Sequence, residues 1–122
     1  MTSEIGTWLE EVARDEKPPA NIVAYNIGLF ESPEGYCAYL SGATRYSEED
    51  PEWARDDTYT PVHRYCVLGD LGGRDSGEVR RSVVESVRSF LGSPVGGASF
   101  LARAQAVTVG FDDGDLVPVK AS

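Results

Sequence analysis

The chain has 122 residues, of which 41% are hydrophobic and 25% are charged, a balance typical of one globular domain. Its net charge is −9, and the excess lies in residues 1–60, which carry thirteen acids and four bases. Nucleic-acid binding needs a basic face, so this charge argues against that function and favours a basic protein partner.

The first four residues lack the basic-then-apolar layout of a secretion signal, and no stretch is apolar enough to cross a bilayer. We therefore expect a cytoplasmic protein with no membrane partner. In that compartment Cys37 and Cys66, which lie in apolar runs, are expected to be small buried thiols, although a disulfide between neighbouring strands stays open. With one histidine and no CxxC motif, the sequence predicts no zinc site and no cofactor.

The predicted elements begin with an amphipathic helix over residues 3–14, stopped by Pro18. Residues 21–30 and 36–41 predict a β-hairpin, in which Gly28 indicates a bulge or a close backbone approach. Residues 62–68 predict a third strand. Asp75 and Glu78 then resemble a capping box at the start of a helix over 76–91, which Gly92 ends.

After this helix, residues 98–104 predict a short helical segment, and residues 107–111 and 116–119 predict two further strands. Pro118 places the last one at a sheet edge. The turn between them contains Asp112, Asp113 and Asp115, whose spacing indicates a hairpin turn rather than a metal site. The order predicts a single α+β domain over residues 1–122, with about five mainly antiparallel strands packed against two main helices.

Residues 47–58 form an acidic loop, the most distinctive segment of the chain. Its closely spaced carboxylates repel one another, which disfavours a helix or a paired strand, and they are expected at the surface. Because charge steers association and a buried aromatic anchors it, Trp53 is expected to anchor a basic partner that these acids attract. The predicted partner-binding residues are Glu48, Glu49, Asp50, Glu52, Trp53, Asp56 and Asp57.

Two alternatives stay open. A small enzyme or ligand-binding domain would use a pocket on the sheet face near His63, together with Tyr39, Arg64 and Tyr65. Strand alternation separates His63 and Tyr65 from Arg64, so the four are not expected to share one face. A structural subunit would instead expose an apolar patch on the free sheet face or on the edge strand near Pro118.

Three stretches carry a family resemblance: residues 25–31 (YNIGLFE), Gly35-Tyr36 with the acidic Trp53 segment, and residues 110–116 (GFDDGDL). In these stretches, and in size, acidity and layout, the chain resembles small acidic immunity proteins of bacterial toxin systems. The resemblance implies a cytosolic, non-enzymatic α+β protein that occludes a toxin domain. The sequence thus predicts an acidic protein-binding domain, and the resemblance implies that it inhibits a basic toxin or nuclease.

Overall fold

A computed structural model describes residues 3–15, 19, 21–33, 35–47, 49–55, 58–62, 64–69, 73–94, 100–111 and 116–121. The helices are α1 (Ser3–Asp15), α2 (Ser76–Leu91) and α4 (Phe100–Arg103), with one 3-10 helix, η1 (Pro51–Arg55). The strands are β1 (Ala24–Ser32), β2 (Gly35–Ala43), β3 (Tyr65–Val67), β4 (Ala106–Phe111) and β5 (Val117–Ala121).

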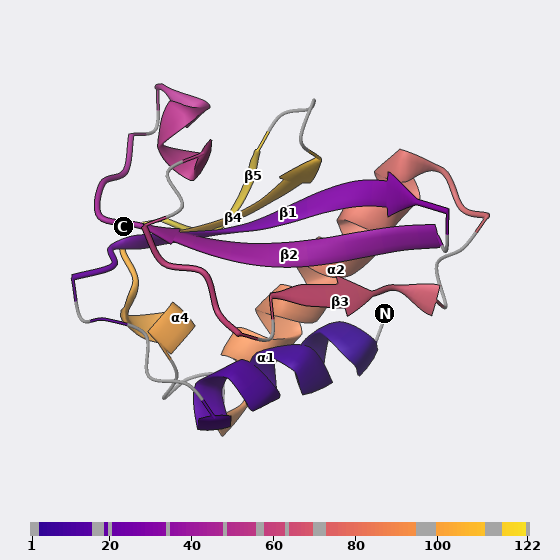
Figure 1. Ribbon diagram of the computed structural model, residues 1–122, viewed down its shortest axis with the longest axis horizontal. Coiled ribbons are helices and arrows are strands. Elements are labelled where there is room, and N and C mark those ends of the chain that lie inside the picture. The colour runs from indigo at the N-terminus through magenta and orange to yellow at the C-terminus, as the bar shows by residue number, and fades with distance from the viewer. Residues whose placement is uncertain are drawn as a thin grey trace.

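The five strands form one mixed sheet in the order β3-β2-β1-β4-β5 (Figure 1). All neighbouring pairs are antiparallel except the central pair β1–β4, which is parallel. A parallel connection needs a crossover, which the chain makes through α2 after leaving the edge strand β3. The α+β prediction, with five mainly antiparallel strands and two main helices, is confirmed.

The helix α2 shows how local sequence sets its limits. The Asp75 carboxylate accepts a hydrogen bond of 2.9 Å from the Glu78 backbone N–H, so Asp75 caps the helix as predicted. This bond lowers the pKa of Asp75 below its usual range. Gly92 follows the last helical residue, and its N–H bonds back to the Arg88 carbonyl.

The main core lies between these helices and one face of the sheet. The apolar stripe of α1 is fully embedded there, as is the valine stripe of α2. On the sheet, this face carries the alternate residues Tyr25, Ile27 and Leu29 of β1 and Tyr36, Ala38 and Leu40 of β2. The remaining alternate residues of β1 and β2 therefore point to the opposite face.

The two cysteines lie on neighbouring strands but on opposite faces. Cys66 pairs with Ala38 in the core, whereas Cys37 pairs with Val67 and faces the other way. Neither cysteine is in a disulfide, and both are buried. Because neighbouring residues of a strand point to opposite sides, a disulfide between Cys37 and Cys66 is sterically excluded.

Tyr25 gives the core a titratable group at its centre. It is 2% exposed and makes edge-to-face contacts with Phe100 at 5.0 Å and Tyr59 at 6.4 Å, measured between ring centroids. Burial raises the pKa of Tyr25 to about 12, and the charge of nearby Arg103 offsets this only in part.

This shift predicts an alkaline loss of stability. Below pH 10 the phenol is protonated in both states, and its contribution is complete. Between about pH 10 and pH 12 only the unfolded chain ionises, so the free energy of unfolding should fall by roughly 2–3 kcal/mol. Urea unfolding at several pH values should show this loss in the wild type and a smaller one in Tyr25→Phe. Equal losses in both proteins would contradict it.

Candidate functional site

The acidic segment is held against the sheet by its own tryptophan. Trp53 lies in η1 and is 2% exposed. Its neighbours form a second, smaller apolar cluster, distinct from the main core, with Ala24, Ala43 and Ala106 from three adjacent strands. In Figure 1, η1 lies at the end of the sheet where β1 begins and β2 finishes. Small alanine side chains leave room there for an indole ring.

The ring of Tyr46 closes over this cluster. Its centroid lies 5.1 Å from that of Trp53, with the two rings near perpendicular. The prediction that Trp53 anchors a partner is therefore corrected: the indole is buried against the protein's own sheet. It fixes the position of the acidic segment instead of contacting a partner.

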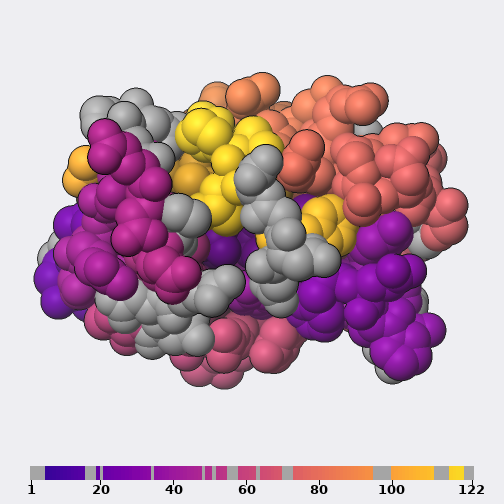
Figure 2. Space-filling model, turned by 90° about the horizontal axis from the view of Figure 1, so that it is seen from above, coloured from indigo at the N-terminus to yellow at the C-terminus, as the bar shows by residue number. Residues whose placement is uncertain are grey.

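Side-chain hydrogen bonds shape the backbone before η1. The Ser47 hydroxyl accepts the backbone N–H groups of Glu49 and Asp50 at 3.3 and 3.2 Å. The Asp50 carboxylate in turn accepts the N–H of Glu52 at 3.0 Å. Glu49, Asp50 and Glu52 are all exposed. Figure 2 shows the magenta segment around η1 as part of the outer surface at one end of the molecule.

The other predicted contact residues of this segment, Glu48, Asp56 and Asp57, lie outside the described residues. His63 also lies outside them, as do the aspartates of the 112–115 turn. The pocket predicted around His63 is thus described only through Tyr39, Arg64 and Tyr65.

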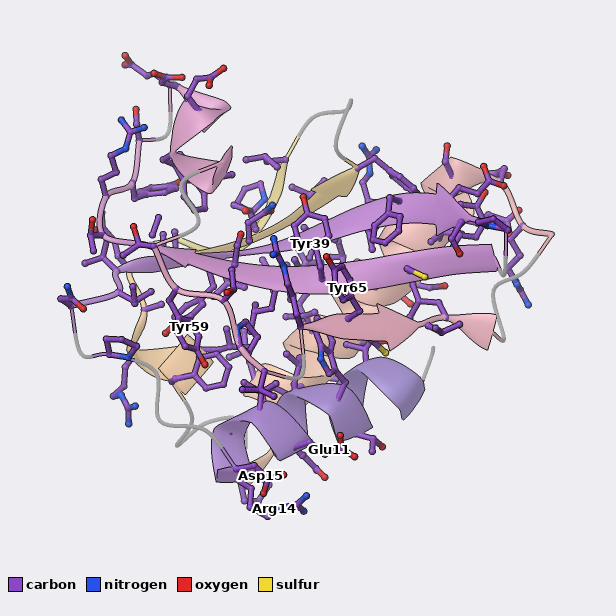
Figure 3. The ribbon with its side chains drawn as sticks, in the orientation of Figure 1. Glu11, Arg14, Asp15, Tyr39, Tyr59 and Tyr65 are labelled. Atoms are coloured by element: carbon purple, nitrogen blue, oxygen red, sulfur yellow. The ribbon has the colours of Figure 1, made fainter. Side chains whose placement is uncertain are left out.

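Those three residues do come together, although strand alternation had separated Arg64 from Tyr65. The Arg64 Cζ atom lies 5.7 Å from the Tyr39 ring centroid and 5.6 Å from that of Tyr65. Arg64 precedes β3, so its side chain does not follow the alternation of the strand. Its guanidinium can therefore reach the rings of Tyr39 and Tyr65, which lie on the sheet face opposite the main core. Figure 3 shows the two tyrosines beside each other on neighbouring strands.

Phe30 joins this group, a contact that sequence reasoning missed. Its ring centroid lies 6.1 Å from both Tyr39 and Tyr65. The signal was present in the hairpin register, because Phe30 faces the same side as Gly28, and Gly28 is paired with Tyr39. A Cβ on Gly28 would lie 2.1 Å from the Tyr39 ring, so the ring covers the backbone there. This confirms the predicted close approach at Gly28.

A buried polar row crosses the centre of the same face. Asn26, Ser41 and Thr108 lie side by side on β1, β2 and β4, each at most 4% exposed. The Thr108 hydroxyl donates to the Asn26 side-chain oxygen at 2.9 Å. Their positions far apart in the chain did not indicate that they would be neighbours. A buried bond of this kind specifies which strand lies beside β1.

Within the described ranges, no group of three or more histidine, cysteine or acidic side chains is placed to hold a metal ion. Nor is any described helix long and apolar enough to cross a membrane. Comparisons with protein-family models, with curated protein sequences and with solved structures gave no match for this chain.

Proposed function

We propose that this protein is a non-enzymatic binding domain that recognises a basic protein, as an immunity-type inhibitor does when it occludes a toxin or nuclease. One observation supports this most strongly. The exposed carboxylates of Glu49, Asp50 and Glu52, here called the acidic turn, lie on a backbone that side-chain hydrogen bonds shape. The buried side chain of Trp53 holds this turn against the sheet. Acidic residues that served only solubility would not need a buried tryptophan to hold them against the sheet.

The charge pattern indicates what this turn does. Exposed carboxylates attract a basic surface over a Debye length of about 10 Å at 0.1 M salt, and they raise the rate of encounter more than the final affinity. The excess of acids in residues 1–60 places this attraction in the half of the chain that contains η1.

The test is a triple variant, Glu49→Gln, Asp50→Asn and Glu52→Gln. Asn at position 50 keeps an oxygen that can accept the Glu52 N–H, so the turn should persist. A basic partner would first be captured from a lysate of the source organism at low salt. Its association rate with the variant should be about tenfold lower, with a weaker dependence on salt.

The matched control is Glu10→Gln, Glu31→Gln and Glu85→Gln, which removes the same charge from exposed acids on α1, β1 and α2. This control should slow association far less, because those acids lie away from the turn. Equal slowing by both variants would mean that only net charge matters. A lysate that yields no salt-sensitive basic partner would contradict the proposed function itself.

A further inference from the structure

In the described part of the chain, the exposed large hydrophobic side chains lie in one short segment. Among the described residues, three large hydrophobic side chains are exposed: Val62 at 88%, Tyr65 at 60% and Val67 at 48%. All three fall within six consecutive positions, in β3 and the residues that lead into it. Scattered exposed hydrophobics are ordinary. Tyr65 and Val67, however, are alternate residues of the edge strand β3 and point to the same face, so together they form an exposed apolar patch of the kind found at interfaces.

The aromatic part of this patch is already ordered. Tyr65 is held edge-on by Phe30 and carries the Arg64 guanidinium on its ring, yet three-fifths of its surface stays in solvent. Because the ring is packed from two sides, little side-chain entropy is lost when a partner covers it. Tyrosine beside arginine is also the composition found in the energetic centres of protein interfaces.

The patch lies on the same side of the sheet as the acidic turn. Tyr65 pairs with Tyr39 and Val67 with Cys37, and these residues share a face with Ala24 and Ala43 below Trp53. Between η1 and β3, Tyr59 bridges to Gly42 and so lies beside β2. One partner surface can therefore meet the carboxylates and the patch together.

Local charge indicates what the partner places on the patch. The Arg64 guanidinium lies within 6 Å of both tyrosine rings, so a cationic side chain would meet repulsion there. A second copy of this chain would bring two molecules of charge −9 together. An apolar side chain flanked by basic residues avoids both costs.

We propose that Tyr65 and Val67 form the apolar anchor site for the basic partner, receiving an aromatic or aliphatic side chain that lysines or arginines surround. This site takes the role that the sequence assigned to Trp53. The proposal rests on the proposed function, because it adds a second contact for the same partner.

Two peptides of identical charge test it, Lys-Ala-Lys-Ala-Lys-Ala-Lys and the same peptide with phenylalanine in place of its central alanine. Each is titrated into the isotopically labelled protein at about 20 mM salt and followed by NMR. The phenylalanine peptide should bind about fivefold more tightly and alone should shift the amides of Tyr65 and Val67. In the variant Tyr65→Ser/Val67→Ser, the two peptides should bind equally.

The triple acid variant is the control, because it should weaken both peptides and keep their ratio. Equal affinity of the two peptides for the wild type, or a ratio that survives in the double variant, would overturn the anchor site while leaving acidic docking intact. Absence of binding by either peptide would overturn both. Dimerisation of the wild type in sedimentation, lost in the double variant, would show that a second copy covers the patch and would also overturn the proposal.

Discussion

Replacing Trp53 by alanine should lower the free energy of unfolding by about 3–5 kcal/mol, the range for truncating a buried tryptophan. The indole is almost fully buried, and the other fully buried members of its cluster are three alanines, whose side chains are too short to fill the volume that it would leave. Urea denaturation followed by the fluorescence of the remaining Trp8 would measure the loss. Trp53→Phe, which keeps an aromatic ring, should cost less than half as much.

The same variant distinguishes the effect of the turn's position on the sheet from the effect of its negative charge. Trp53→Ala keeps every carboxylate, so its net charge is unchanged. If the turn acts through its position on the sheet, association with a basic partner should slow even in solutions where the variant remains folded. A free energy of unfolding close to that of the wild type would contradict the burial of the Trp53 indole against the sheet. An unchanged association rate in a folded variant would show that the turn acts only through its negative charge and not through its position.

Replacing Gly42 by valine should destabilise the fold by about 3 kcal/mol, at the upper end of the range for overpacking. A Cβ at this position would lie 2.8 Å from Ile22 Cγ2 and 3.0 Å from the Tyr25 ring. Tyr25 has no room to yield, because Phe100 and Tyr59 hold its ring from two sides. Thermal and urea unfolding would measure the effect.

Gly28→Ala is the instructive comparison. A Cβ at position 28 would lie only 2.1 Å from the Tyr39 ring, a closer approach than the 2.8 Å between a Cβ at position 42 and Ile22. That clash involves the far end of the half-buried Tyr39 side chain, which can swing towards solvent. We therefore expect a cost below about 1 kcal/mol, together with altered NMR signals from Tyr39 and Tyr65. A larger cost for Gly28→Ala than for Gly42→Val would show that the side chains around Tyr39 are packed more tightly than the main core.

Much of the fold could be predicted because its signals are local. The Asp75 cap and Gly92 end bracket α2 at the predicted residues, and the stripe of α1 is periodic. The third strand was predicted too long, since regular pairing is limited to Tyr65–Val67. The parallel pairing of β1 with β4 was not foreseen, because strand direction depends on where α2 returns the chain and on contacts such as Asn26–Thr108.

The site was predictable only in part. The carboxylates before η1 were placed at the surface because charge density is visible in the sequence, and those that are described lie there. The burial of Trp53 was not predictable, because its seat is made of Ala24, Ala43 and Ala106, which lie far apart in sequence. Arg64 was misplaced because alternation was extended one residue beyond the start of β3.

The parallel pair also sets an order of events during folding. The hydrogen bond between Asn26 and Thr108 joins positions 82 residues apart, whereas β1 meets β2 through a tight hairpin. During synthesis the hairpin and β3 can assemble first, and the inner edge of β1 has no partner until β4 has left the ribosome. For that interval the future centre of the sheet is an open edge. Productive folding is then a competition between β4 and any other extended chain that reaches β1.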